Sequence, residues 1–443
     1  MGNAASTRLL QRRSRLALAL LLLYLGRKSL GRFIASVLMR RHLMRAAETP
    51  RLVYRATDGN KKLLSHCPTI TKRKYYPPWR LFNGHLQTVR FAYDERGPKI
   101  NYKRQLLTLP DGGVVSLDWA LLASQKAPAK LGDPNKSAWS TWLPDVEPTR
   151  RTVLLLPGLT GGSPENYIRS TIARLHELGW QCVVLNARGC ADTPVRTAQL
   201  FCSAYTGDLR FVLRQLSDKY EFAREAFVAV GFSMGSNVLV KCLGEDGDET
   251  PLTGAVSIGN PFDLAICSAN FGGSLFNRMT YDKALNTNLR ELFFNKCNAA
   301  EQFVDFPGVD LEAIKASRTV RDFDDTLTKF VFHYDTVDDY YNDAGSVKKL
   351  SGVRVPLLCI NAEDDPISIR SALPQDDEVK ANPNVILCTT KSGGHLAFYE
   401  SSLKDHVGQE DGETDSTKQS NMWTVNPIAE FAEAVRLNKV EIV

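Results

Sequence analysis

The chain has 443 residues, of which 43% are hydrophobic and 23% are charged, as is usual for a globular protein that buries a full core. Its nine cysteines are odd in number and have no repeated spacing, which fits free thiols in a reducing compartment better than a disulfide framework. The net charge of +6 hides a strong asymmetry. Residues 1–80 contain 18 Lys/Arg and 2 Asp/Glu, a net charge of +16, whereas the remainder carries −10. The sequence therefore predicts a basic arm in front of an acidic body.

The arm, residues 1–47, has the composition of a membrane anchor. The run Met1–Ser6 fits the N-myristoylation pattern, which predicts lipidation at Gly2. Residues 16–25 are apolar and uncharged, but a bilayer span needs about 20 such residues. Leucines rather than stacking aromatics separate the arginines, which favours a membrane over a nucleic acid as partner. We expect a membrane-associated protein whose body faces the cytosol.

Two other interpretations of the arm remain open. In the first interpretation, residues 16–39 form a single signal-anchor span that crosses the membrane. The second is a mitochondrial presequence, which an Arg-rich segment free of acidic residues also resembles, although the leucine block is atypical.

After the arm, the first predicted elements are an early hairpin and a central strand. Residues 103–109 and 114–122 alternate as paired strands around the turn 111–113. Residues 152–156 predict a buried strand, followed by the glycine-rich loop 157–163. This loop lacks the Lys-Ser/Thr pair of a phosphate cradle, so we assign it an oxyanion role. The Leu159 amide is the expected donor, with Thr160 as its alternative.

Helices and strands then alternate up to a sharp turn. We predict a helix over 164–178 that is capped by Ser163, a strand over 181–186 and a helix over 205–220. The apolar strand 226–230 then leads into Gly231-Phe232-Ser233-Met234-Gly235, ahead of a further helix. A serine between two glycines at a strand-to-helix turn is the pattern of a nucleophile elbow. We therefore predict Ser233 as the nucleophile and the Met234 amide as the second oxyanion donor.

A helical insertion follows the strand 253–258. Residues 261–350 have helical periodicity and many aromatics, and we expect them to form a lid. Within them, the run 322–328 spells the nucleophile motif of haloacid-dehalogenase-type phosphatases. That chemistry requires a buried strand ahead of the first aspartate, and residues 316–321 are too charged for one. We expect these acids to cap a helix or to line the pocket rim.

An acid and a histidine each follow a predicted strand near the C-terminus. The strand 355–361 leads to Asp364 and Asp365, and the strand 385–390 leads to His395. The order Ser, acid, His is that of α/β-hydrolases. Asp365, directly before a proline, is the preferred acid, and Asp364 is the alternative. A polar stretch, 404–421, precedes a closing helix over 427–436.

Taken together, these motifs resemble the AB hydrolase type-4 family, which includes YheT-like esterases, membrane-bound lipid hydrolases, embryogenesis-associated proteins and medium-chain ethyl ester synthase/esterases. The similarity runs from about Tyr75 to the C-terminus and includes the run 75–89 and the motifs around Arg188 and Asp338. It implies an α/β-hydrolase fold with a mostly parallel sheet and an inserted lid. It also implies a family-specific extension over 48–100, a hydrolase domain over 101–443, and Ser233, Asp365 and His395 as the triad.

The expected function is that of a serine hydrolase acting on carboxylic esters of lipids or of medium- and long-chain acyl groups. Alcohol O-acyltransfer through the same triad is one alternative, and an inactive lipid-binding protein is another. We expect no cofactor, no metal and no nucleic acid, with a lipid substrate and a membrane as partners. The sequence leaves the oligomeric state open.

Overall fold

The computed structural model of the chain describes residues 47–122, 146–401 and 422–440. Gly2 and the apolar segment 16–39 lie outside these ranges, so the predictions for the anchor arm remain predictions. None of the helices within the ranges has the length and hydropathy that a bilayer-spanning segment requires.

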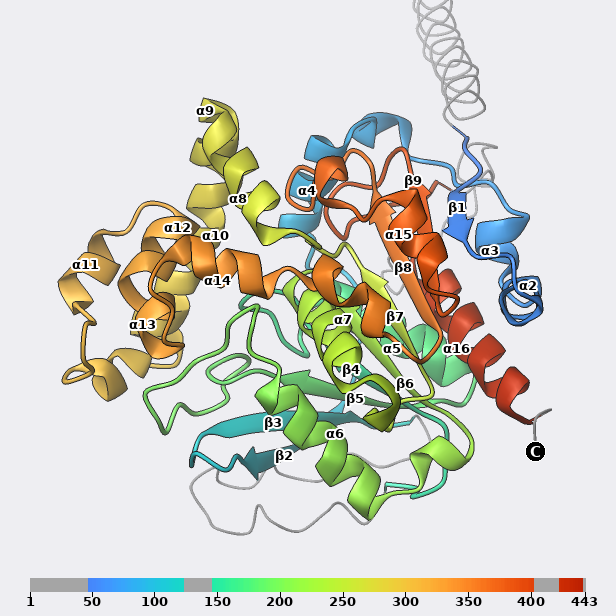
Figure 1. Cartoon of the computed structure of the whole chain (residues 1–443), viewed down its shortest axis with the longest axis horizontal. Coiled ribbons are helices and arrows are strands. Elements are labelled where there is room, and N and C mark those ends of the chain that lie inside the picture. Colours follow the sequence, from blue (N-terminus) through green and yellow to red (C-terminus); the bar gives the residue numbers. More distant parts are fainter. Residues whose placement is uncertain (1–46, 123–145, 402–421, 441–443) are drawn as a thin grey trace, which may run out of the picture.

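A single nine-stranded sheet organises the described chain (Figure 1). Its strand order is β1-β9-β8-β7-β6-β4-β5-β3-β2. The six central strands, β9 to β5 in that order, are parallel, and β1, β2 and β3 pair antiparallel at the two edges. The strands are β1 (Arg51–Tyr54), β2 (Tyr102–Thr108), β3 (Val114–Ala120), β4 (Thr152–Leu156), β5 (Gln181–Asn186), β6 (Phe227–Phe232), β7 (Gly254–Ile258), β8 (Leu357–Ala362) and β9 (Val385–Thr390).

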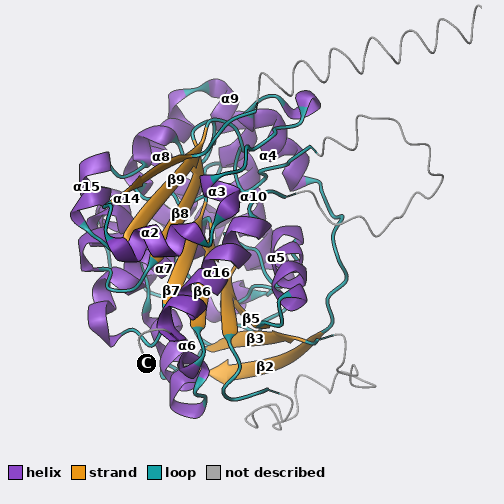
Figure 2. Cartoon of the chain, turned by 90° about the vertical axis from the view of Figure 1, so that its right-hand side faces the viewer, coloured by secondary structure: helices purple, strands orange, loops and turns teal. Residues whose placement is uncertain are grey.

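The central strands are buried on both faces because their side chains alternate between two apolar cores. On β4, Val153 and Leu155 face one core, whereas Leu154 and Leu156 face the other. The first core is covered by α2, α3, α5 and α16, and the second by α6, α7 and α15 (Figure 2). These helices are α2 (Asp58–Ser65), α3 (Pro68–Thr71), α5 (Asn166–Glu177), α6 (Gly207–Lys219), α7 (Met234–Asp246), α15 (Asp376–Ala381) and α16 (Val425–Val440).

The chain between β7 and β8 leaves the sheet and builds a separate helical layer, at the left in Figure 1. The layer has its own apolar cluster, which includes the buried rings of Phe293 and Phe303. It occupies the position predicted for a lid. Its helices are α8 (Leu264–Gly273), α9 (Leu275–Asn277), α10 (Lys283–Glu291), α11 (Leu311–Ala316), α12 (Val320–Phe323), α13 (Lys329–Val331) and α14 (Val337–Ala344). One further helix, α4 (Gly84–Ala92), precedes the sheet core in sequence.

Two local features differ from the sequence-based expectation. Strand β1 was not predicted; its four residues pair with β9, more than 300 residues away. Ser163 does not cap α5, because the helix begins at Asn166 after Glu165. Instead, the Ser163 hydroxyl donates to the buried Asp118 carboxylate at 2.5 Å. That bond ties the glycine-rich loop to β3.

A buried arginine joins the edge hairpin to α6, which packs on the sheet. Arg188 follows β5 and is 2% exposed. Its guanidinium makes two hydrogen bonds to Asp208 of α6, both of 2.7 Å, and two more to Asp111 in the turn between β2 and β3. A charge removed from water in this way is tolerated only because its donors are satisfied.

Replacing Arg188 with alanine should leave the Asp208 carboxylate, whose side chain is only 17% exposed, without a cation. We expect the free energy of unfolding to fall by about 3–5 kcal/mol, measured by urea denaturation. Arg224→Ala is the matched control, since Arg224 pairs with Glu221 at the surface, where both side chains are at least 70% exposed. That change should cost about 1 kcal/mol or less. An equally small effect of Arg188→Ala would contradict a structural role for the cluster.

Candidate active site

Ser233 sits at a strained turn between β6 and α7. Its φ of 51° and ψ of −120° lie in a region of backbone conformation that residues other than glycine rarely adopt. The glycines two positions before and after it, Gly231 and Gly235, are required because a side chain at either position would collide with neighbouring backbone atoms. A Cβ at Gly231 would lie 2.5 Å from the Cα of Ser236, and one at Gly235 would overlap the carbonyl oxygens of Leu156 and Pro157. The turn therefore presents the serine hydroxyl beyond the carboxyl end of the sheet.

The three side chains predicted from the sequence form one hydrogen-bonded chain. His395 Nε2 lies 2.8 Å from Ser233 Oγ, and His395 Nδ1 lies 2.9 Å from Asp365 Oδ2. The second oxygen of Asp365 accepts the backbone N–H groups of Ile367 and Ser368 at 2.7 and 2.9 Å. The carboxylate of Asp365 is thus fixed from behind and is buried at 3% exposure. This arrangement fixes the imidazole orientation that proton transfer from a serine needs.

Asp364, the alternative acid, has a different environment. Its Oδ1 accepts the backbone N–H of Gly394 at 2.9 Å, next to the histidine, and no hydrogen bond joins it to the imidazole among the described residues. Burial raises the pKa of Asp364 to about 6. The geometry therefore favours Asp365 as the partner of His395 and gives Asp364 a role in shaping the histidine loop.

Helix α4, from the family-specific extension, holds that loop in place. The Thr88 hydroxyl donates to the carbonyl of Gly84 at 2.7 Å and accepts the backbone N–H of His395 at 2.8 Å. A Cβ at Gly84 would collide with the backbone of Asp364, so the helix and the acid loop are in direct contact. Thr88 was not predicted as a site residue, although it lies in the motif 75–89. Its contact to His395 joins residues 307 positions apart, so no local sequence pattern indicates it.

The glycine-rich loop after β4 runs beside the nucleophile. A Cβ at Gly158 would lie 3.3 Å from the Cβ of Ser233, and the Gly158 N–H donates to the Tyr167 hydroxyl at 2.9 Å. Leu159 and Met234, the predicted oxyanion donors, line the same cavity as Ser233 and His395. Met234 is the first residue of α7, where helical amides have no intrahelical partner. Thr160 has a left-handed φ of 58°, which bends the loop at this point.

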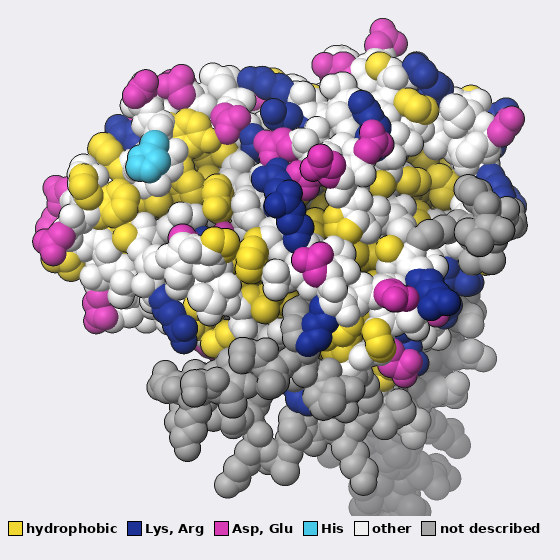
Figure 3. All heavy atoms as spheres, turned by 60° about the horizontal axis from the view of Figure 1, so that its bottom comes forward, with side chains coloured by type: hydrophobic (Ala, Val, Ile, Leu, Met, Phe, Trp, Pro, Cys, Tyr) yellow, Lys and Arg dark blue, Asp and Glu magenta, His cyan; other side chains and the backbone are white. Residues whose placement is uncertain are grey.

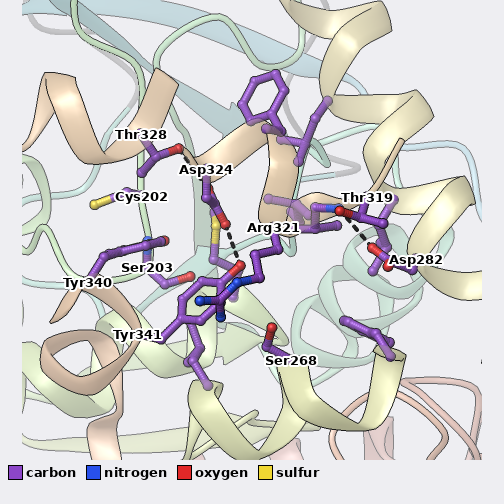
Figure 4. A pocket seen from close by; sticks show the side chains of 18 of the residues that line it. Cys202, Ser203, Ser268, Asp282, Thr319, Arg321, Asp324, Thr328, Tyr340 and Tyr341 are labelled. Carbon is purple, nitrogen blue, oxygen red and sulfur yellow. Dashed lines mark hydrogen bonds between the residues drawn. The ribbon is translucent and has the colours of Figure 1, made fainter. Parts of the chain in front are cut away.

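A cavity of about 350 Å³ opens at Ser233 and extends beneath the inserted helices. Its walls are mainly apolar, and they come from both the sheet end and the lid: Leu159, Met234, Leu264, Leu289, Phe303, Leu327 and Val331. Figure 4 shows the polar side chains that line it, among them Asp324 with its partners Thr328 and Tyr341. The buried Asp324 accepts hydrogen bonds from Thr328 at 2.6 Å and from Tyr341 at 2.8 Å, and burial raises the pKa of Asp324 to about 6. Such a cavity suits a hydrocarbon chain with few polar contacts.

The phosphatase-like motif, residues 322–328, does not follow a strand and is helical instead. Asp322 lies in α12 and forms a capping box with Thr319, and Asp324 begins the π-helical turn that follows. Both acids also line the cavity, as the sequence analysis expected of them. Within the ranges that the structure describes, no group of three or more His, Cys, Asp or Glu side chains is arranged to hold a metal ion.

The fold and this site define the class of the protein. Residues 151–402 match the family model of the alpha/beta hydrolase fold. The chain is 34% identical to the embryogenesis-associated protein EMB8 of Picea glauca, over 86% of this chain and 77% of that protein. It is 34% identical to human phospholipase ABHD3, over 81% of each, and 29% identical to medium-chain fatty acid ethyl ester synthase/esterase 2 of Saccharomyces cerevisiae, over 79% and 83%. The chain belongs to the α/β-hydrolase fold family, in the type-4 group that its motifs resemble.

Removing the Thr88 hydroxyl should loosen the histidine loop without touching the reacting groups. Thr88→Val keeps the shape of the side chain but leaves the buried N–H of His395 unsatisfied, so we expect kcat on a soluble ester to fall about tenfold. Thr88→Ser restores the hydroxyl and should bring kcat back to within about twofold of the parent. Unchanged kcat in the valine variant would show that α4 does not position His395.

Proposed function

We propose that the protein is a serine hydrolase that cleaves carboxylic ester bonds of lipids or of medium- and long-chain acyl esters. The observation that carries the proposal is the continuous hydrogen-bonded chain from Ser233 through His395 to Asp365. In this proposal the N-terminal arm, which is basic and leucine-rich in sequence, attaches the enzyme to a membrane with the hydrolase domain on the cytosolic side.

The geometry supports a two-step acyl transfer. Ser233 Oγ attacks the ester carbonyl while His395 Nε2 takes its proton, and Asp365 stabilises the imidazolium that forms. The amides of Met234 and Leu159 receive the negative charge on the carbonyl oxygen. His395 then returns the proton to the departing alcohol, which leaves an acyl group on Ser233. A water molecule, deprotonated by His395, releases the acid and restores the hydroxyl.

The cavity and the relatives support a lipid-like acyl group. The apolar walls shared by the sheet end and the lid accept hydrocarbon, and the names of two relatives, phospholipase and ethyl ester synthase/esterase, refer to acyl esters. The second of these names also favours one alternative, alcohol O-acyltransfer, in which an alcohol replaces water in the second step. The remaining alternative, an inactive lipid-binding protein, does not require the short contacts of His395.

A fluorophosphonate probe tests the proposal directly, because it reacts only with a serine whose proton can be removed. We expect the purified full chain to be labelled and Ser233→Ala to show no labelling and no ester hydrolysis. A parent protein that stays unlabelled would favour the inactive lipid-binding alternative.

Two neighbouring acids provide a matched pair for the same assay. Asp365→Asn should reduce kcat by about 10⁴, since the imidazole loses the group that fixes its tautomer. Asp364→Asn keeps an oxygen for the Gly394 N–H, so it should change kcat less than about tenfold. The reverse ranking would assign the acid to Asp364.

Filling the lid end of the cavity should shorten the preferred acyl chain. Leu289, from α10, lines the cavity and packs in the lid cluster. We expect Leu289→Trp to lower kcat/KM for long-chain p-nitrophenyl esters about tenfold while short-chain esters are hydrolysed at the parental rate. Thermal unfolding of the variant checks that the larger ring has not disrupted the lid. Equal losses at all chain lengths would place the acyl group elsewhere.

A further inference from the structure

The exposed apolar side chains of the body are concentrated in two short segments. Eleven large hydrophobic residues are exposed among those the structure describes, and nine of them fall within 79–93 and 266–279. Scattered exposed apolar residues are ordinary, but a contiguous group marks an interaction surface. The nine are Trp79, Phe82, Leu86, Val89, Tyr93, Ile266, Leu275, Phe276 and Met279.

The two segments are joined into one surface by His85 of α4. Its ring meets the Phe276 ring edge-on at a centroid distance of 5.3 Å, and its Nδ1 lies 2.8 Å from the Tyr281 hydroxyl. Figures 1 and 2 both place α4 and α9 at the same, upper end of the molecule. We call the surface formed by residues 79–93 and 266–279 the α4–α9 face.

Within the two segments the charged side chains are all basic, whereas the acidic residues Asp94, Asp263 and Asp282 lie directly beside the ends of the segments. Residues 72–93 contain five Lys/Arg and no Asp/Glu, and residues 264–281 contain Arg278 as their only charged residue. Arg80 lies over the Trp79 ring at 5.1 Å from its centroid. The lower side of the molecule is different: Figure 3 shows acidic and basic side chains intermixed among apolar ones there. Aromatic and aliphatic side chains interspersed with basic ones are the composition that binds an anionic lipid surface.

The position of the face connects it to the catalytic site. Helix α8, which precedes the exposed residues of α9, contributes Phe271 and Gly272 to the cavity wall. Helix α4 carries exposed residues on its outer side, while on its inner side Thr88 binds the histidine loop. A bilayer in contact with this face would therefore lie next to the elements that surround Ser233.

The described chain also begins beside this face. The backbones of Glu48 and Tyr75 form two hydrogen bonds with each other, of 3.0 and 2.7 Å. Tyr75 lies four residues before Trp79 in the sequence. The 46 residues that precede the described chain carry the basic, leucine-rich sequence of the arm. The described chain therefore begins next to the segment that leads into the α4–α9 face.

We propose that the α4–α9 face of the body docks onto the surface of an anionic phospholipid bilayer, with Trp79, Phe276 and Met279 at the depth of the lipid head groups. This contact is additional to any attachment by the arm and does not depend on catalysis. Its partner is the lipid surface, which also supplies the apolar substrate of the proposed hydrolysis.

Tryptophan quenching reports the docking without depending on hydrolysis. The Ser233→Ala full chain is mixed with phosphatidylcholine–phosphatidylserine vesicles whose acyl chains are brominated. We expect the vesicles to quench part of the tryptophan emission, and Trp79→Phe in the same background to remove that quenched component. Quenching that is unaffected by Trp79→Phe, on vesicles that bind the protein, would overturn the proposal.

A variant of the lid side tests whether the face serves turnover at a membrane. In the triple variant Leu275→Ser/Phe276→Ser/Met279→Ser we expect kcat/KM on vesicle-embedded ester to fall at least about tenfold. Hydrolysis of a soluble short-chain ester should stay at the parental rate. Val304→Ser is the matched control, because Val304 is as exposed as Met279, at 63%, but lies outside the face.

Three outcomes would contradict the docking role. The first is an equal loss of vesicle turnover in Val304→Ser, and the second is no loss in the triple variant. The third is self-association of the full chain without vesicles, measured by sedimentation, that the triple variant abolishes. That result would assign the face to a second copy of the chain.

Discussion

The site depends on one constraint, the strained turn at Ser233. Holding a serine at a φ of +51° costs about 1–3 kcal/mol, and the surrounding structure has to supply it. Helix α7 starts so close to the end of β4 that only glycine fits at position 235. The same close approach sets the first amides of α7 and the loop after β4 beside the serine hydroxyl. Ser233 and the amides proposed as oxyanion donors are therefore positioned by a single packing arrangement.

Helix α4 adds a second support, which the sheet alone does not provide. The loops after β8 and β9 carry the acid and the histidine, and both contact this nine-residue helix through Gly84 and Thr88. Burying these groups leaves the outer side of α4 with its apolar residues exposed. One short helix thus has a polar inner side that orders the histidine loop and an apolar outer side.

The sequence predicts most of the sheet, and it also singles out the three side chains that the structure brings together, because those signals are local. Strands 152–156, 181–186 and 385–390 have the predicted bounds, since each is a fully buried apolar run. What could not be predicted depends on distant partners. The four residues of β1 form a strand only because β9 offers a free edge. The choice between Asp364 and Asp365 depends on the direction in which a turn points each carboxylate, and Ser163 had a distant acceptor, Asp118, that outweighed helix capping.

The place where the helical layer is inserted has a consequence for how such proteins diversify. All of α8 to α14 enters and leaves the sheet between two adjacent parallel strands, β7 and β8, whereas Ser233, Asp365 and His395 follow β6, β8 and β9. The glycine contacts of the turn at Ser233 and the contacts of α4 to the histidine loop lie outside this stretch, so a change in its length or residues can alter the shape of the cavity without removing them. The scaffold therefore separates selectivity from chemistry, so that a new substrate range can evolve by exchange of a single continuous module.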